Sequence, residues 1–306
     1  MQEIVVVSGK GGTGKTSLTA TFAMLAHNSV LCDADVDAAD LHLLLDPRIE
    51  RRHDFMGGGL AVIDRDRCNE CRTCRRLCRF DAISEDYVVD PISCEGCGVC
   101  VDLCPEKAID FPIQKCGEWF VSTSRGGPMV HARLGIGEEN SGKLVSLVRR
   151  QARDLAKSRE LELIITDGPP GIGCPVIAAI SGATMLVLVV EPSMSGLHDL
   201  DRVVRLAEHF RVPAQVIINK YDLNLAMTAE IEGWTVERNL RLLGRVPFDP
   251  LFVETMVAGK TVVELAARTT TADIVREIWQ RIGHALTING AREKGFPIAL
   301  HTNQEM

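Results

Sequence analysis

A cysteine pattern that occurs twice between residues 68 and 104 constrains this chain more than any other feature. Each copy has the spacing C-x2-C-x2-C-x3-C, and the second copy begins 26 residues after the first. The flanks repeat as well, because an Ala-Ile pair follows each copy, at 82–83 and at 108–109. The eight cysteines are Cys68, Cys71, Cys74, Cys78, Cys94, Cys97, Cys100 and Cys104. Cysteines at such regular intervals predict that this segment binds metal.

The duplicated run resembles that of bacterial ferredoxins, which hold two [4Fe–4S] clusters and in which the fourth cysteine of each run ligates the other cluster. Structural zinc is the alternative, but zinc sites usually combine two cysteine pairs that lie well apart in sequence. Arg79 stands where a ferredoxin has proline. The resemblance implies one cluster on Cys68, Cys71, Cys74 and Cys104, and a second on Cys78, Cys94, Cys97 and Cys100.

A second motif lies near the N-terminus, directly after the β-branched run at residues 4–7. Residues 9–16 read GKGGTGKT, the G-x4-G-K-T pattern of a phosphate-binding loop between a buried strand and a helix. In such a loop Lys15 reaches the terminal phosphates and Thr16 ligates Mg²⁺. The residues predicted to bind nucleotide here are Gly9, Lys10, Gly11, Gly12, Thr13, Gly14, Lys15, Thr16 and Ser17.

Composition limits the classes of protein that remain. The 306 residues, 46% of them hydrophobic, can bury a full α/β core and still carry a small insert. A net charge of −7 argues against a nucleic-acid partner. The clustering of most of the eleven cysteines indicates a reducing cytosol and not a secreted disulfide protein. We therefore expect a cytoplasmic protein with no signal peptide and no membrane span.

Strand and helix patterns alternate along the rest of the chain, as a doubly wound parallel sheet requires. Strands are expected at 4–7, 30–32, 161–166, 185–190 and 215–218, and helices at 16–27, 144–159, 196–210 and 271–286. Residues 114–142 are expected to form loops and edge strands. The predicted fold is α/β, a doubly wound, mostly parallel P-loop NTPase sheet with a small inserted ferredoxin-like α+β domain. Its parts are an ATPase domain (1–59 and 114–290), the insert (60–113) and a polar tail (291–306).

An additional lysine, Lys10, precedes the glycines of the phosphate-binding loop. With this feature the chain resembles the deviant P-loop ATPases of the MinD/ParA superfamily, to which the nitrogenase iron protein and the Mrp-type iron–sulfur carriers also belong. The resemblance implies that the nucleotide is ATP. It also implies a homodimer, or a dimer with a related ATPase, in which Lys10 reaches the partner's nucleotide.

Further segments match this superfamily in order, up to about residue 250. Asp33-Ala34-Asp35 resembles switch I, whose second aspartate, here Asp35, helps to activate the attacking water. Asp167, which precedes Gly-Pro-Pro-Gly, resembles the Walker B aspartate at the start of switch II. The resemblance thus implies Mg²⁺ at Thr16, Asp33 and Asp167, and catalytic roles for Lys10, Lys15 and Asp35.

The adenine-binding side is matched as well. Asn219 and Lys220 resemble the element that reads the base, and Pro247 lies in a segment, 246–249, that resembles the loop packing on it. Asp222 completes an N-K-x-D string that is typical of guanine-binding proteins, whereas the deviant P-loop favours ATP.

Cys174 lies seven residues after Asp167, inside the segment that resembles switch II. In the nitrogenase iron protein branch, a cysteine at a similar offset ligates a cluster shared between subunits. A third, bridging cluster at Cys174 therefore stays open, with Cys116 as the candidate for a further ligand. The alternative is that Cys174 packs as a small hydrophobic residue.

The predicted function is that of a dimeric, Mg²⁺-dependent, ATP-hydrolysing iron–sulfur protein. Its nucleotide state would control electron transfer through two [4Fe–4S] clusters to a partner protein or metallocofactor. Six arginines between residues 65 and 79, against two acids, predict an acidic redox partner. The first alternative is an assembly ATPase that carries clusters or metal to an apo-acceptor protein. The second is a redox-sensing regulatory ATPase, and in no case do we expect nucleic acid or a membrane as a partner.

Overall fold

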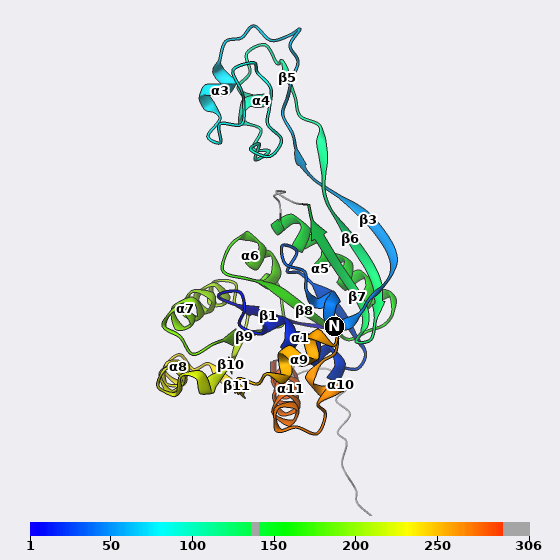
Figure 1. Ribbon diagram of the computed structural model, residues 1–306, viewed down its shortest axis with the longest axis vertical. Helices are drawn as coiled ribbons and strands as arrows, with labels where there is room; N and C mark the ends of the chain where they lie inside the picture. The colour runs from blue at the N-terminus through cyan, green and yellow to red at the C-terminus, as the bar shows by residue number, and fades with distance from the viewer. Residues whose placement is uncertain (136–140, 290–306) are drawn as a thin grey trace, which may run out of the picture.

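The computed structural model describes residues 1–135 and 141–289 of the protein, and in these residues the main element is a nine-stranded sheet (Figure 1). Its strand order is β11-β10-β9-β1-β8-β2-β7-β6-β3. All neighbours from β11 to β7 are parallel, whereas β6 is antiparallel to both β7 and β3. The strands are β1 (Gln2–Ser8), β2 (Ser29–Asp33), β3 (Arg48–Gly59), β6 (Ile113–Ser124), β7 (Gly127–Leu134), β8 (Leu163–Pro170), β9 (Met185–Val190), β10 (Ala214–Asn219) and β11 (Arg241–Val246).

Helices cover both faces of this sheet, which is why its central strands are continuous apolar runs and not alternating ones. One face packs against α5 (Ser141–Ser158), α6 (Cys174–Ile180), α7 (Met194–His209) and α8 (Leu225–Glu237). The other packs against α1 (Lys15–Leu25), α2 (Leu41–Leu45), α9 (Leu251–Val257), α10 (Val262–Leu265) and α11 (Thr270–Asn289), while the 3-10 helix η1 (Tyr221–Leu223) follows β10. We call the sheet and these helices the body.

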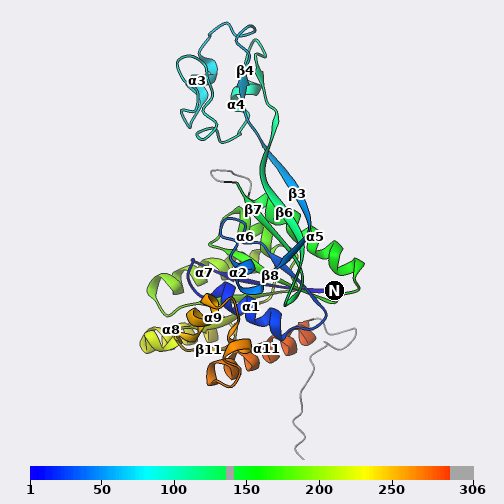
Figure 2. The ribbon, with the colours of Figure 1, turned by 45° about the vertical axis from the view of Figure 1, so that its right-hand side comes forward.

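Residues 60–112 form a separate lobe, which stands away from the body at the end of a long two-stranded ribbon (Figure 2). The ribbon consists of β3 and β6, which pair antiparallel from Arg48 opposite Thr123 to Gly59 opposite Ile113. The lobe contains a two-stranded sheet of β4 (Val62–Ile63) and β5 (Ile109–Asp110), and the short helices α3 (Thr73–Leu77) and α4 (Val99–Asp102). Its chain therefore enters and leaves through two adjacent strands.

The expected strands and helices of the body are confirmed, with boundaries that shift by at most four residues. Two differences lie around the ribbon. The sequence did not indicate β3, because Arg48–Gly59 is mostly exposed and lacks apolar alternation, so pairing with β6 is what makes it a strand. Residues 113–134 do return as strands, but β7 lies inside the sheet between β2 and β6 and not at its edge. The expected tail at 291–306 lies outside the described residues.

None of the described helices combines the length and the apolar character that crossing a bilayer would require. The carboxyl ends of the parallel strands, where α/β proteins bind their ligands, carry the polar residues of interest. Register places two of them side by side, since Asp33 of β2 is paired with Asp167 of β8. This edge of the body is therefore where we look for a nucleotide site.

Candidate nucleotide site and cysteine cavities

The loop between β1 and α1 turns sharply just before the helix begins. Gly14 has φ of 87°, and a Cβ at this position would lie 2.3 Å from Nδ2 of Asn219, so a larger residue would be strained there and would displace the Asn219 amide. That Asn219 amide donates to the carbonyl of Thr13 at 2.7 Å, and Lys220 Nζ donates to the carbonyl of Gly12 at 2.8 Å. The end of β10 thus holds the loop in place, and the N-terminus of α1 points its free N–H groups into the loop.

Behind the loop, one lysine is surrounded by aspartates. Lys15 Nζ lies 3.0 Å from Oδ1 of Asp167 and 3.2 Å from Oδ2 of Asp35, and its side chain is only 6% exposed. Burial alone would lower the pKa of Lys15, but the charges of Asp167 and Asp35 outweigh burial and raise it. Thr16 Oγ1 donates to Asp167 at 2.8 Å. The residues predicted to bind phosphate and Mg²⁺ therefore meet at one point.

The charge of this cluster suits a bound cation. Burial, followed by the charge of Asp167, raises the pKa of Asp33 well above its usual range, and burial likewise raises that of Asp35. Three carboxylates face one lysine, so a divalent cation would relieve their repulsion. No three acidic, thiol or imidazole groups in the described part of the chain are placed to hold one metal ion directly.

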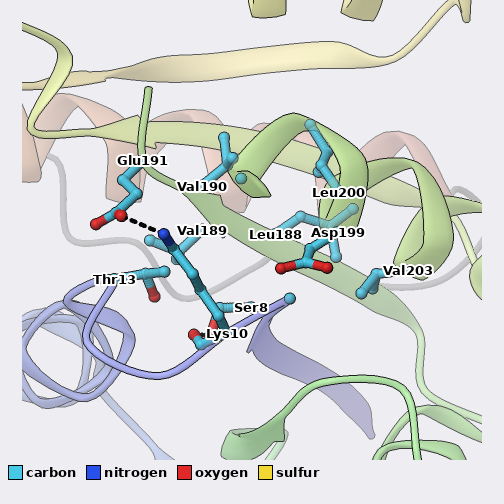
Figure 3. Close-up of a pocket in the computed structure, with 12 residues that line it drawn as sticks. Ser8, Lys10, Thr13, Leu188, Val189, Val190, Glu191, Asp199, Leu200 and Val203 are labelled. Atoms are coloured by element: carbon cyan, nitrogen blue, oxygen red, sulfur yellow. Dashed lines mark hydrogen bonds and ion pairs between the residues drawn. The ribbon is translucent and has the colours of Figure 1, made fainter. Parts of the chain in front are cut away.

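Lys10 lies apart from this cluster and contacts the end of β9 (Figure 3). Its Nζ is 2.5 Å from Oε1 of Glu191 and 3.2 Å from the hydroxyl of Ser195. The residues drawn in Figure 3 line a cavity that is formed by Lys10 and its loop, by β9 and by α7. Sequence reasoning missed Glu191, although it directly follows a predicted strand at the ligand-binding edge, which is the signal that could have identified it.

Two buried polar atoms on the base side lack a partner among the described residues. They are Oδ1 of Asn219 and Oγ1 of Thr13. A buried acceptor normally receives a hydrogen bond, and a ligand with an amino group would donate the one that Oδ1 of Asn219 lacks. Asp222 accepts from the N–H of Phe248 at 2.6 Å, which ties the segment containing Pro247 to the same edge of the sheet. Asp222 is thus engaged with the chain itself.

In the lobe, the eight cysteines line two cavities, four in each. The first is lined by Cys68, Cys71, Cys74 and Cys104, with Ile63, Ile109 and Tyr87 among its other residues. The second is lined by Cys78, Cys94, Cys97 and Cys100, with Ala61, Leu77, Phe80 and Phe111 among its other residues. The fourth cysteine of each run therefore faces the cavity of the other run.

The thiols of each set are close enough to influence one another. Burial, together with the charges of Cys94 and Cys97, raises the pKa of Cys100 to about 11. Burial also raises the pKa of Cys74, beside Cys68 and Cys71. The four thiols that line each cavity are the residues that would hold a metal site there.

The repeated Ala-Ile pairs have a structural counterpart at these cavities. The N–H of Ala82 donates to Sγ of Cys78 at 3.4 Å, and the N–H of Ala108 donates to Sγ of Cys104 at 3.3 Å. Both fourth cysteines thus receive the same backbone hydrogen bond. Hydrogen bonds to ligand sulfurs orient the ligands of a metal site and tune its electronic properties.

The two remaining candidate ligands lie elsewhere. Cys174 is exposed at the start of α6, where it lines a cavity between α5 and α6. Cys116 is buried in β6 among the core residues of the body. No second cysteine of the described residues lines the cavity of Cys174. A bridging cluster at Cys174 stays a prediction.

Comparison with known proteins extends these observations. Residues 4–262 match the model of the CobQ/CobB/MinD/ParA nucleotide binding domain. An uncharacterized protein of Methanocaldococcus jannaschii is 30% identical over 285 residues, which cover 92% of this chain and 96% of that protein. The septum site-determining protein MinD of Pyrococcus horikoshii, complexed with Mg-ADP, has a TM-score of 0.59 and 18% identity, with 95% of this chain and 99% of that one covered. The dihydromethanopterin reductase (acceptor) of Methanosarcina mazei is 47% identical over 53 residues, 15% of this chain and 22% of that protein.

Proposed function

Because the chain belongs to the CobQ/CobB/MinD/ParA nucleotide-binding family, we propose that it is a Mg²⁺-dependent ATPase that controls electron transfer through two [4Fe–4S] clusters. The observation that carries the proposal is the pair of cavities in the lobe, each lined by four cysteines drawn from both runs. The short stretch of high identity with a reductase supports a redox role. The body would bind and hydrolyse ATP. The lobe would hold the clusters, which would carry the electrons.

The charged cluster behind the loop suggests how ATP binding changes this chain. Lys15 is paired with Asp35 and Asp167, and the terminal phosphate of ATP would compete for the same ammonium group. Release of Asp35 from Lys15 would free its carboxylate to orient the attacking water. Lys10 would likewise have to leave Glu191 to reach the nucleotide of a dimer partner.

A chain of contacts joins this site to the ribbon that carries the lobe. Oδ2 of Asp33 accepts from the N–H of Leu41 at 3.3 Å, at the start of α2. Only two residues separate α2 from β3, so the base of the ribbon follows directly. The carbonyl of Val36 accepts from the N–H of Leu134 at the end of β7. Movement of Asp33 and Asp35 on phosphate release would therefore reach the ribbon through α2.

The second cavity lies on the ribbon side of the lobe. Gly96, between two of its cysteines, lies so near the ribbon that a Cβ would be 2.8 Å from the carbonyl of Gly59. This cavity is lined by Ala61 and Phe111, whereas the first is lined by Ile63 and Ile109, which lie one step farther from the ribbon. A cluster in the second cavity would thus be the proximal one, and motion of the ribbon would reach it first.

The surface beside the second cavity fits the proposed acidic redox partner. Leu77 and Phe80 line this cavity and are 41% and 43% exposed. The arginines at positions 75, 76 and 79 are their neighbours in sequence, and the last two are exposed. The exposed Arg76 and Arg79, which are close in sequence to this apolar patch, would attract an acidic partner and steer its approach.

The test is anaerobic purification, iron and sulfide counting, and EPR of the reduced protein with and without MgATP and an apo-acceptor protein. We expect about eight irons that stay bound and spectra that respond to nucleotide. Lys15→Ala should reduce ATP turnover by at least about a hundredfold while the iron content is unchanged. Lys157→Ala, an exposed lysine of α5, is the matched control and should leave both unchanged.

A carrier function is the competing proposal, and one observation favours it. Cys71 and Cys97, one at each cavity, are exposed, and an accessible ligand is what cluster transfer to another protein needs. Transfer of about four irons to the apo-acceptor on addition of ATP, one cluster's worth, would establish the carrier and refute electron transfer.

A further inference from the structure

A third cavity, of about 780 Å³, lies between α5 and α6, on the face of the sheet opposite α1. One side is formed by Gly142, Ser146, Arg149 and Arg153, whose spacing places them on one face of α5. The other side is formed by Cys174, Ile177, Ala178 and Ser181. Its volume is in the range of small-molecule sites. Neither the nucleotide site nor the cysteine cavities of the lobe include these residues.

The cavity is positively charged. Lys143, Arg149 and Arg153 line it, and no acidic side chain of the described residues does. Glu3 of β1 lies behind the two arginines and accepts from Arg149 Nε at 2.7 Å and from Arg153 Nη2 at 2.7 Å. Within the described parts of the chain Lys143 forms no ion pair. Among the described residues, one carboxylate therefore faces three cations at this cavity.

Arg149 provides the decisive observation. Its side chain is only 4% exposed, and Nη1 donates to the carbonyls of Ala178 and Ser181 at 2.6 and 2.9 Å. Its Nη2 is buried and has no hydrogen-bond partner among the described residues. A buried guanidinium nitrogen normally donates to a carboxylate, a carbonyl or a phosphate oxygen. The first turn of α5, at Ser141 and Gly142, adds the positive end of an 18-residue helix.

We propose that this cavity is a second ligand site, which binds a small molecule bearing a carboxylate or phosphate group. The anionic group would receive hydrogen bonds from Arg149 Nη2 and Arg153, and Lys143 would complete its charge. The site does not depend on the clusters or on ATP hydrolysis.

The experiment uses the intact iron–sulfur protein with Mg²⁺ and a saturating non-hydrolysable ATP analogue, which fills all the phosphate positions of the P-loop. Calorimetric titration with inorganic phosphate and, separately, with malonate measures the affinity. Alkylation of Cys174 by iodoacetamide, followed by mass spectrometry, locates the ligand, because this exposed thiol lines the cavity. We expect one of the two anions to bind, and the one that binds identifies the anionic group. That anion should also slow alkylation of Cys174 in a saturable way.

Lys143→Ala and Arg153→Gln should each weaken binding by roughly tenfold, the loss of one charged contact. Lys157→Ala, on the same helix but outside the cavity, should leave it unchanged. Substitution of Arg149 is avoided, since its contacts with Glu3 and α6 support the fold. The proposal is overturned if neither anion binds at about 10 mM. Equal binding by the Lys143 and Arg153 variants would overturn it as well.

Discussion

The body and the lobe of this protein are stabilised in different ways. The body buries long apolar strands between two layers of helices, and residues such as Ile4, Val5 and Ile165 are completely inaccessible. The lobe has five buried residues in its core, one of them Cys74, and five more cysteines pack against them. A core this small cannot offset the entropy of ordering the chain. We therefore expect the body to fold without its ligands, whereas the lobe would need its ligands in order to fold.

The largest effect should come from removing metal. Chelation of iron should unfold the lobe, because metal–thiolate sites contribute on the order of 10 kcal/mol to small domains. Hydrogen exchange should then show loss of amide protection at 60–112, while the strands of the body remain protected. Protection of the lobe that survives complete removal of iron would contradict this contrast.

Single cysteine substitutions sharpen the same comparison. Cys74→Ser should reduce bound iron by about half, one cluster of two, since this thiol is a buried member of the first cavity. Cys174→Ala is the matched control and should retain all iron, unless it binds a bridging cluster. Iron and sulfide counting of the two variants distinguishes these outcomes.

A substitution in the core of the body should lower the stability of the body and leave the lobe unaffected. Ile165→Ala, in the centre of β8, should lower the free energy of unfolding of the body by roughly 2–5 kcal/mol, because a large buried side chain leaves a cavity. Iron content should not change, because in the described part of the chain the lobe is joined to the body through the ribbon. Urea unfolding followed by circular dichroism gives the first quantity. A matching loss of iron would show that the regions are not independent.

A smaller effect should appear with pH and only in the body. Burial, together with nearby His42, lowers the pKa of His131 to about 4, and its Nε2 lies 2.9 Å from the hydroxyl of Ser122. The unfolded chain binds this proton near pH 6.5, so the folded state loses about 2 kcal/mol between pH 7 and pH 5. His131→Gln should flatten the stability curve over this interval. Urea titrations at both pH values measure the change, and an unaltered slope would argue against it.

Local patterns in the sequence predicted more of the body than of the ribbon. The apolar run at 185–190 is β9 with the same boundaries, because a continuous apolar segment of this length is buried in any α/β sheet. By contrast, β3 is rich in arginine and is a strand only because β6 lies beside it. Glu191 and Arg149 were not predicted as site residues for a related reason, because each of them contacts residues more than twenty positions away in sequence.

The chemical groups of this protein could be read from its sequence: the phosphate-binding loop around Lys15, the strand-end aspartates and the eight cysteines at fixed intervals. Each of these features is a short sequence pattern, which can be recognised from neighbouring residues and their local backbone preferences. Which of these groups come into contact depends on the folded chain. Strand register brings Asp33 beside Asp167, and the folding of the lobe places Cys104 with the first run and Cys78 with the second. Such contacts depend on pairing between distant segments, which sequence spacing alone does not specify.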